Sequence, residues 1–310
     1  MIRSAKGCPF SQKSYEMPTG MTGMMRALLL AVLLLAGCAL NPASGRKQLN
    51  LLSVEQEISL GQEASGQFLD RLGGPIRSEP IRQYVDQVGR ELARLSERPD
   101  LPWEFQVVDS HELNAFALPG GKIFISRGLL ARLDDEAMLA AVLAHEIAHT
   151  TARHIGEQMT QKMILQGLLT VADTARKQHE RRWLSVLGVG AEMGSTLYLL
   201  KFSRQQELEA DQIGLRYIVL AGYDPRGLVR VLELLAEQET SDGRLPILAT
   251  HPDPAERVRR AASYVKRQYP IADDRFIVNA DRFDAVVRRH LASLPGPRHP
   301  ARTASSPTQP

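Results

Sequence analysis

The chain has 310 residues, of which 44% are hydrophobic and 24% are charged, values that are ordinary for a soluble globular protein. This length accommodates one large domain or two small ones. The net charge of +3 is too small to indicate nucleic-acid binding, and no basic run is interleaved with aromatic residues, so no nucleic acid is expected as a partner. The two cysteines, Cys8 and Cys38, both precede the expected globular part, which excludes a disulfide framework there.

The N-terminus has the pattern of an export signal. Arg26 precedes an apolar run over 27–36 that is too short to span a bilayer but matches the hydrophobic core of a signal peptide. The run ends in Leu35-Ala36-Gly37-Cys38, which resembles the bacterial lipobox. The alternatives are an ordinary signal peptide or an anchor helix. We predict a lipoprotein-type signal peptide over 1–37 and lipidation of Cys38.

Two further features belong to this signal. The segment before Met24 is long for the start of a signal peptide, which indicates that translation begins at Met21, Met24 or Met25. The residue after the cysteine is Ala39 rather than Asp. In lipoproteins of this kind that implies sorting to the outer membrane, with the protein facing the periplasm.

Helical patterns follow the cysteine. Residues 38–50 are polar, with Pro and Gly, and predict a tether. Ser53 and Gln56 resemble a capping box that opens a helix, which Gly73-Gly74-Pro75 ends. A second helix, with apolar residues at helical spacing, follows Pro80.

The apolar period then changes to two residues, which indicates strands. Strands are predicted over 103–108, 113–117 and 122–126, with a turn at 119–121. We expect a small, antiparallel sheet whose last strand can hold an extended peptide by edge pairing. A short helical connector over 127–132 leads out of it.

The sequence H-E-x-x-H then stands within an apolar helical pattern. His145 and His149 are four residues apart, so on a helix they share one face and can bind one Zn²⁺, while Glu146 can act on a water molecule there. Asp134 is the expected N-cap, and the helix is expected to continue to about Gln166. Because so short a motif also arises by chance, a third ligand is needed to identify H-E-x-x-H as a zinc site.

Two standard third ligands can be tested on the sequence. A metzincin needs Gly three residues and His six residues after the second histidine, but the chain has Ala152 and Ile155 there. His154 falls outside that spacing and is expected on the helix surface. The other solution is a Glu on a separate downstream helix, and a helix over 204–220 supplies Glu207.

Glu207 and Asp211 lie four residues apart and share a helical face, whereas Glu209 points to the opposite side. Glu207 can therefore ligate zinc while Asp211 accepts a hydrogen bond from a ligand imidazole, which fixes the ring tautomer. The alternative is that this acidic cluster is a solvated helix face.

The rest of the chain is less specific. Residues 183–200 are apolar and predict a packed helix or active-site cover, with a membrane-contacting segment as the alternative. Asp224-Pro225 and Asp253-Pro254 open two later helices, the second with a capping box completed by Glu256. We predict one peptidase domain over 51–294 and a disordered tail over 295–310.

Taken together, these motifs resemble the zinc metallopeptidase family of the CAAX prenyl protease, in particular its soluble bacterial periplasmic lipoprotein members of the BepA, LoiP and YcaL type. The resemblance covers about residues 50 to 270. No tetratricopeptide array follows, and there is no set of membrane spans as in the prenyl protease, so prenyl-protein processing is not expected. The matching motifs, in the family's order, are Asn114-Ala-Phe-Ala-Leu-Pro-Gly-Gly121, His145-Glu-Ile-Ala-His149, Ser203-Arg204 with Glu207-Leu-Glu-Ala-Asp211, Ala221-Gly-Tyr-Asp-Pro225 and Thr250-His-Pro252.

The resemblance implies an α+β, mainly helical, zincin-like fold and the mechanism of a gluzincin. In that mechanism, His145, His149 and Glu207 hold one zinc ion, and Glu146 moves the proton of its water. The oxyanion-stabilising residue stays open, with Arg204, Tyr198 and His251 as candidates. In BepA-type relatives, a histidine corresponding to His251 can occupy the fourth position on zinc. The alternative is that His251 only packs beside Pro252.

The expected protein is therefore a zinc endopeptidase on the periplasmic face of the bacterial outer membrane, held by a lipid anchor. Its expected substrates are misfolded or unassembled envelope polypeptides, and the outer-membrane assembly machinery is a further expected partner. The alternative is a chaperone-like assembly factor whose zinc site is mostly closed. An intact Glu146 favours the enzyme, because a structural site needs no general base.

Overall fold

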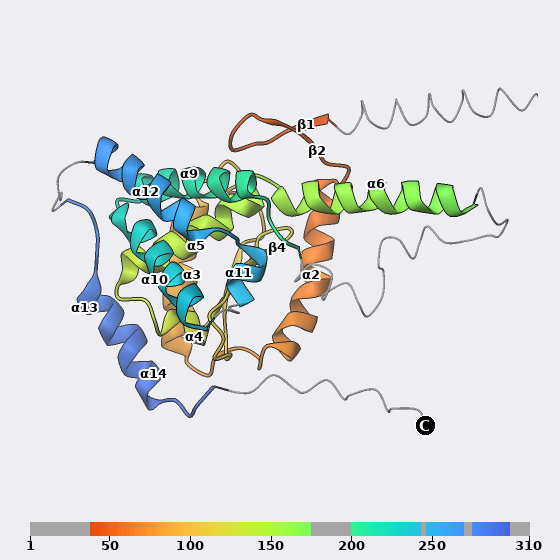
Figure 1. Ribbon diagram of the computed structural model, residues 1–310. Helices are drawn as coiled ribbons and strands as arrows, with labels where there is room; N and C mark the ends of the chain where they lie inside the picture. The colour runs from red at the N-terminus through yellow and green to blue at the C-terminus, as the bar shows by residue number, and fades with distance from the viewer. Residues whose placement is uncertain (1–37, 175–199, 243–245, 270–274, 298–310) are drawn as a thin grey trace, which may run out of the picture. The chain divides into compact units, whose positions relative to one another are not determined.

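The computed structural model describes residues 38–174, 200–242, 246–269 and 275–297 (Figure 1). The chain forms two compact units, Met1–Cys38 and Ala39–Pro310, and nearly all described residues belong to the second. The predicted signal peptide, most of the apolar segment 183–200 and most of the predicted tail lie outside the described residues. The predicted class is confirmed, because the chain is mainly helical with a small sheet before the H-E-x-x-H helix.

The segment predicted as a tether is built into the fold from Ala39 onward. Strands β1 (Cys38–Leu40) and β2 (Lys47–Leu49) pair with each other, and Asn41 between them is only 1% exposed. Helix α2 (Val54–Arg71) follows with the predicted capping box of Ser53 and Gln56. Helix α3 (Glu79–Ala93) buries the predicted apolar stripe.

The three-stranded sheet is mixed rather than antiparallel, which corrects the prediction. Its order is β3-β5-β4, formed by β3 (Glu104–Val108), β4 (Ala115–Leu118) and β5 (Lys122–Ser126). The turn after Leu118 makes β4 and β5 an antiparallel hairpin, but β5 inserts between β4 and β3 and so runs parallel to β3. Since β5 is the central strand, it cannot hold a peptide by edge pairing, and that expectation was wrong.

Helix α5 (Glu136–Thr151) carries H-E-x-x-H, and all of its residues are buried. Its N-cap is Asp135 rather than Asp134, with the Asp135 side chain accepting the backbone N–H of Met138 at 2.9 Å. Helices α3, α9 and α10 pack around α5, as Figure 1 shows. The helix does not continue to Gln166, because Arg153 adopts a left-handed φ of 58° and a new helix begins after it.

The break at Arg153 is fixed by contacts outside α5. The Arg153 guanidinium donates to Glu57 Oε1 at 2.9 Å and to the carbonyl of Leu52 at 2.6 Å. Left-handed backbone costs free energy for a residue with a Cβ, and these bonds offset that cost. The break turns α6 (His154–Thr174) into a new direction.

Helix α9 (Arg204–Leu220) lies directly against α5. Gly214 makes this possible, because a Cβ there would come within 3.3 Å of the backbone of Ala144 and His145. The close approach brings the acidic residues of α9 to the histidines of α5. The remaining short connector and later helices are α4 (Arg127–Leu130), α10 (Arg226–Asp242), α11 (Pro246–Thr250), α12 (Pro254–Gln268), α13 (Ala280–Phe283), the π-helical turn η1 (Asp284–Arg288) and α14 (Arg289–Ser293).

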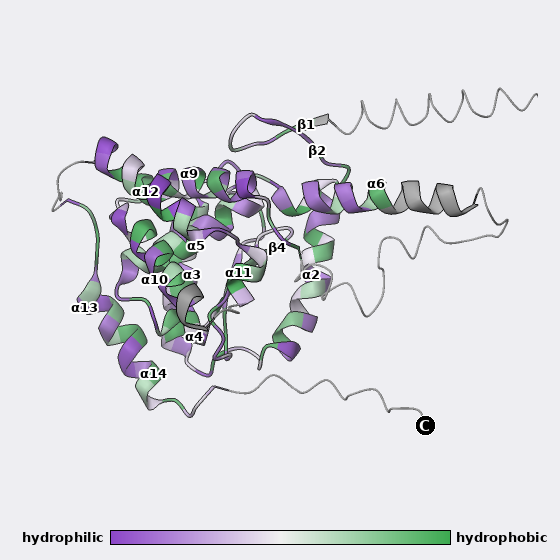
Figure 2. Ribbon diagram, viewed as in Figure 1, coloured by the Kyte–Doolittle hydropathy of each residue, from purple (hydrophilic) through white to green (hydrophobic). Residues whose placement is uncertain are grey.

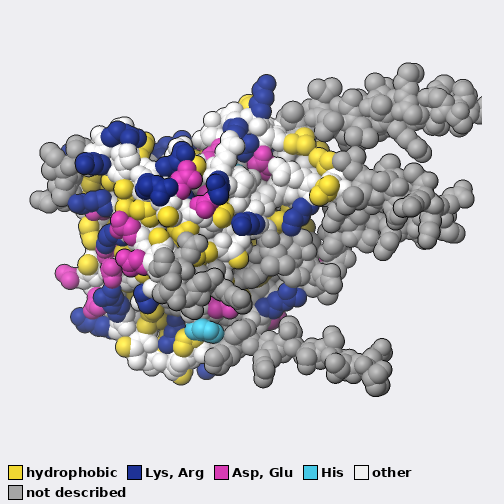
Figure 3. Space-filling model, in the orientation of Figure 1, with side chains coloured by type: hydrophobic (Ala, Val, Ile, Leu, Met, Phe, Trp, Pro, Cys, Tyr) yellow, Lys and Arg dark blue, Asp and Glu magenta, His cyan; other side chains and the backbone are white. Residues whose placement is uncertain are grey.

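Helix α12 begins differently from the prediction. Asp253 has a left-handed φ of 59° and makes no side-chain cap, so no capping box with Glu256 forms. Hydrophobic and hydrophilic residues alternate along α10 and α12 (Figure 2), and Lys and Arg side chains mix with Asp and Glu on the face in Figure 3. No helix in the described ranges is long and apolar enough to cross a membrane.

Candidate metal centre

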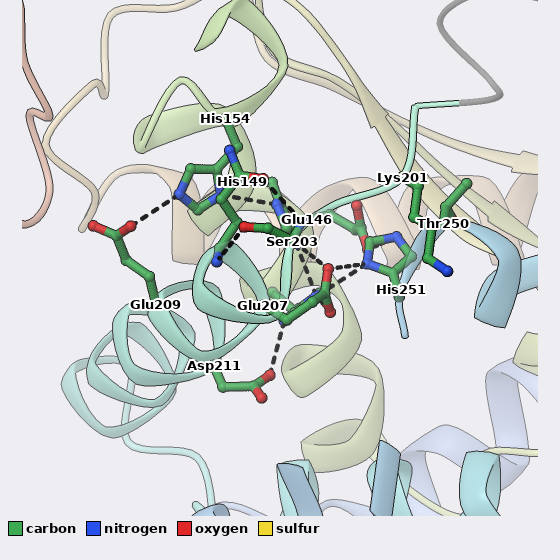
Figure 4. A network of polar contacts seen from close by, with 12 residues as sticks. Glu146, His149, His154, Lys201, Ser203, Glu207, Glu209, Asp211, Thr250 and His251 are labelled. Carbon is green, nitrogen blue, oxygen red and sulfur yellow. Dashed lines mark hydrogen bonds and ion pairs between the residues drawn. The ribbon is translucent and has the colours of Figure 1, made fainter. Parts of the chain in front are cut away.

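The two histidines of H-E-x-x-H point to the same place. His145 and His149 are buried, and their Nε2 atoms lie 3.0 Å apart. Both imidazoles lie within 3.5 Å of Glu207 of α9, and Figure 4 shows His149 beside that carboxylate. The helical spacing that predicted a shared face is thereby confirmed.

Helix α9 brings a carboxylate to both imidazoles. Its N-terminus is fixed by a capping box between Ser203 and Gln206, which sets the position of Glu207 in the first turn. The Glu207 carboxylate lies 3.3 Å from Nε2 of His149 and 3.5 Å from Nε2 of His145. Glu207 is fully buried, so the alternative of a solvated acidic face is wrong for this residue.

A third imidazole joins the group from the loop after α11. Nδ1 of His251 lies 3.0 Å from Glu207 Oε1 and 3.4 Å from Nε2 of His145. The loop is tied down by the backbone N–H of His251, which bonds the carbonyl of Ile247, and by that of Phe202, which bonds the carbonyl of Thr250. The four side chains His145, His149, Glu207 and His251 each offer a ligand atom, all within 4.8 Å of one another.

This geometry fits a metal ion. Zinc binds its ligands tetrahedrally at about 2.0–2.1 Å, which places the ligand atoms roughly 3.3 Å apart. Distances between nitrogen and oxygen atoms of neighbouring members of the set lie between 3.0 and 3.5 Å, and all four ligand atoms fall within 4.8 Å of one another. Imidazole nitrogens that face each other this closely and a carboxylate that faces all three form a donor set suited to zinc.

Asp211 lies beside His145. Its Oδ1 lies 3.0 Å from Nδ1 of His145, so an Nδ1–H bond to Asp211 leaves Nε2 free toward the cluster. Arg257 of α12 holds Asp211 in turn, with bonds of 2.7 and 2.8 Å to the two carboxylate oxygens. Arg257 also lies 2.5 Å from Glu207 Oε2.

The ionisation of this cluster is set by its charges and hydrogen bonds together. Burial opposes the charged form of Glu207, but Arg257, His251 and the hydrogen bonds from His145 and His149 together hold the pKa of Glu207 well below its usual range. Burial and Arg257 oppose protonation of His145, yet its hydrogen bonds to Asp211 and Glu207 raise its pKa to about 9. Binding of a metal ion by His145 therefore requires the release of a proton.

Glu146 occupies the position expected of a general base. It is 2% exposed, its Oε1 lies 3.7 Å from Nε2 of His251, and its Oε2 has no hydrogen-bond partner among the described residues. A cavity of about 20 Å³ beside it is lined by His145, His251 and Arg257 and by apolar residues of α10. That volume holds about one water molecule.

A larger cleft lies on the other side of Phe202. It has a volume of about 760 Å³ and runs between α6 and the segments 201–206 and 252–253. Glu146 does not line it, whereas Phe202 does and also stacks on His149 with ring centroids 3.8 Å apart. Phe202 therefore contacts both this cleft and the four-residue cluster.

Four further residues lie at or near the cluster differently from what the sequence indicated, or were not predicted at all. Arg204 is 73% exposed in its side chain and pairs with Asp253, so it does not join the cluster, and Tyr198 lies outside the described residues. His154, expected on the surface, is fully buried against His149 because of the helix break. Sequence reasoning missed Arg257, although its place soon after Thr250-His-Pro252 is a usable signal, and it missed Phe202, for which the sequence holds no signal.

Comparison with known proteins agrees with this geometry. Residues 81–265 match the model of peptidase family M48. Mitochondrial metalloendopeptidase OMA1 of Schizosaccharomyces pombe is 32% identical over 227 residues, which cover 72% of this chain and 65% of that protein. The beta-barrel assembly-enhancing protease of Escherichia coli K12 is 30% identical over 237 residues, covering 74% of this chain and 48% of that protein.

The chain thus spans about half to two thirds of the length of these curated relatives. The matched residues include α5 and α9 and the loop that carries His251. The resemblance read from the motifs is confirmed: the chain belongs to peptidase family M48, a family of zinc metallopeptidases.

Proposed function

We propose that the protein is a zinc-dependent endopeptidase, anchored to the periplasmic face of the outer membrane through Cys38, that cleaves misfolded or unassembled envelope proteins. The observation that carries the proposal is the buried cluster of His145, His149, Glu207 and His251 beside Glu146. The names of the relatives, a metalloendopeptidase and a beta-barrel assembly-enhancing protease, support the reaction and the substrate class.

The chain's own residues have distinct tasks in this proposal. His145, His149 and Glu207 hold the zinc ion, and Asp211 keeps His145 in the required tautomer. When bound, zinc lowers the pKa of a water molecule to about 7 and polarises the scissile carbonyl. Glu146 takes a proton from the water and delivers it to the leaving amine. The unpartnered Oε2 of Glu146 is suited to this task, because no protein donor competes for it among the described residues.

The position of His251 favours a restrained enzyme. A catalytic zinc site keeps its fourth position open, whereas a fourth protein ligand closes it. The cavity beside Glu146 is far smaller than the roughly 300–1,000 Å³ of a ligand pocket. Movement of α11 and His251 would open it. The same observation favours the second candidate, a chaperone-like assembly factor with a mostly closed zinc site.

Proteolysis of an unfolded polypeptide tests the proposal. The purified protein should contain one zinc per chain by elemental analysis and cleave casein. A chelator should stop cleavage, and added zinc should restore it. The chaperone-like factor would be favoured if the zinc-loaded protein binds unfolded polypeptides but does not cleave them, even when α11 and His251 have moved away from the cluster.

Replacing His251 tests the restraint. His251→Ala should keep zinc, because three ligands remain, and should raise basal cleavage several-fold, self-cleavage included. The measurement is the initial rate of casein cleavage together with zinc content. Lower activity with zinc retained would instead indicate a role in the transition state, and unchanged activity would leave only packing.

The anchor is tested separately at Cys38. Cys38→Ser should leave either a soluble periplasmic form or an unprocessed precursor. Mass spectrometry and membrane fractionation of the natural and variant proteins measure this. An unmodified Cys38, or cleavage at another position, would contradict the anchor without affecting the proposed peptidase activity.

A further inference from the structure

A hydrogen-bonded chain leads away from His149 to the outside of the domain. Nδ1 of His149 lies 3.0 Å from Nδ1 of His154, and Nε2 of His154 lies 3.3 Å from Oε2 of Glu209 (Figure 4). Both histidines are 0% exposed. Apolar residues and Gly214 also lie where α5 packs against α9.

The order of donors in this chain follows from chemistry. The Glu209 carboxylate only accepts hydrogen bonds, so Nε2 of His154 carries the hydrogen. In a neutral imidazole the other nitrogen is then an acceptor, so Nδ1 of His154 accepts from Nδ1–H of His149. That leaves Nε2 of His149 with a free lone pair, directed at Nε2 of His145 and at Glu207. With a neutral His154, Glu209 therefore favours the tautomer of His149 in which Nε2, the nitrogen that faces the metal site, carries no hydrogen.

Three side chains from the segment Asn41–Arg46 converge on Glu209. Asn41 Nδ2 donates to Glu209 Oε1 at 2.9 Å, Ser44 Oγ donates to the same oxygen, and Arg46 Nε lies 3.3 Å from Oε2. Asn41 is fixed in place because its own Oδ1 accepts the backbone N–H groups of Ala43 and Ser44. We call this segment the strap.

Arg46 also ties the strap to α6. Its guanidinium bonds both oxygens of Glu157 at 3.2 and 2.8 Å, and Glu157 accepts from Gln206 Nε2 at 3.0 Å. Arg46 is thus shared between the helix that carries His154 and the helix that carries Glu209. A bidentate arginine–carboxylate pair is geometrically specific, so Arg46 links the strap to both helices.

The two histidines of the motif are therefore supported by parallel arrangements. Asp211 supports His145 and is clamped by Arg257, whereas Glu209 supports His149 through His154 and is clamped by Arg46. Arg257 lies within the residues that match the family model, but the strap precedes that match, which begins at residue 81.

We propose that the strap Asn41–Arg46 is a positioning element of the metal site, which holds Glu209 so that Glu209 and His154 fix the tautomer and direction of His149. His154 and Glu209 are positioning residues in this arrangement. The inference rests on the proposed function only in that zinc binds the cluster. It assigns a task to a segment that the sequence indicated only as a tether.

The test measures zinc affinity rather than proteolysis. The full-length protein is titrated with zinc against a chromophoric chelator, as the natural protein, as Glu209→Gln and as Arg46→Gln. Loss of a residue that orients a metal-ligating histidine costs about 10–100-fold in metal affinity, and we expect a change of this size for Glu209→Gln. Arg46→Gln, which leaves Asn41 and Ser44 on Glu209, should weaken zinc binding by a smaller factor.

Arg216→Gln is the matched control. Arg216 also contacts the strap, at 3.4–3.5 Å from the carbonyl of Ala43, but does not touch Glu209 or His154. Because bonds this long are weak, the variant should bind zinc within about threefold of the natural protein. The free energy of unfolding without metal, measured for every variant, separates lost zinc affinity from lost stability.

Nitrogen NMR of the histidine rings supplies a second readout. The natural protein should show His149 with its hydrogen on Nδ1 only, and Glu209→Gln should show a mixture of tautomers. A natural protein that binds no zinc would overturn the proposed function. A natural protein that binds zinc, with Glu209→Gln and Arg46→Gln both within about threefold of it, would overturn the strap proposal alone.

Discussion

Two buried glutamates on the same helix have opposite surroundings. Glu136 begins α5 and is 1% exposed, and Glu146 lies near its other end and is 2% exposed. Glu136 accepts from Tyr84 Oη at 2.5 Å, from Tyr223 Oη at 2.9 Å and from Asn279 Nδ2 at 2.8 Å. Nη1 of Arg282 lies 3.3 Å from Oε2 of Glu136. Glu146 has an oxygen with no partner among the described residues.

The difference separates a structural carboxylate from one suited to chemistry. Burying a charge without hydrogen bonds costs several kcal/mol, so a carboxylate that only stabilises the fold is expected to have all of its donors, as Glu136 does. A general base must instead keep an oxygen available for the proton that it takes. We therefore propose that Glu136 serves stability and that Glu146 serves catalysis.

The largest effect should come from Glu146→Gln. A general base contributes about 10²–10⁴-fold to the rate, and glutamine keeps the shape but cannot take the proton, so casein cleavage should fall by that factor. Zinc content and thermal stability should stay at or above the natural values, because the variant removes a buried charge with an unpartnered oxygen. Unchanged turnover would contradict the proposal that Glu146 is the general base.

Glu136→Gln should give the opposite pattern. The amide keeps one oxygen but loses the charge and places an NH₂ group against the donors around it, so stability should fall by about 2–3 kcal/mol. The cleavage rate per folded molecule should stay near the natural value, since Glu136 and the metal site lie at opposite ends of α5. Urea unfolding and zinc-loaded kinetics measure the two quantities. A stable but inactive variant would contradict the assignment.

The sequence predicted the features of the fold and of the metal site that depend on local spacing. The two histidines of α5 and the pair Glu207 and Asp211 of α9 were predicted to share faces, because a helical period fixes the face of each side chain. The capping box at Ser53 was predicted for the same local reason, whereas the one at Ser203, although equally local, was not predicted. These features need no knowledge of which helices pack together.

Contacts between distant segments could not be predicted in this way. His154 is buried because Arg153 breaks the helix, and that break depends on Glu57 and Leu52, about 100 residues earlier. Strand β5 inserts between β3 and its hairpin partner β4, and it runs parallel to β3. Period-2 alternation does not specify which strands are neighbours. The partners of Glu136 likewise come from α3, from the turn after α9 and from the loop before α13.

The smallest expected effect tests one donor of Glu136. Tyr223 is 2% exposed, and burial together with the charge of Glu136 raises its pKa above the usual value, so it donates throughout the neutral range. Tyr223→Phe removes that hydrogen bond but fills the same space, and Asn279 still donates to the same oxygen. The loss of stability should therefore be about 1 kcal/mol, with no change in the cleavage rate.

A double-mutant cycle decides whether this loss belongs to the pair. In the Glu136→Gln background, Tyr223→Phe should cost clearly less than in the natural protein, because the charged acceptor is already gone. Urea unfolding of the four proteins gives the coupling free energy directly. An equal cost in both backgrounds would mean that Tyr223 stabilises α5 only by packing. Glu136 would then be less completely satisfied than its distances indicate, and its contrast with Glu146 would be weaker by that one bond.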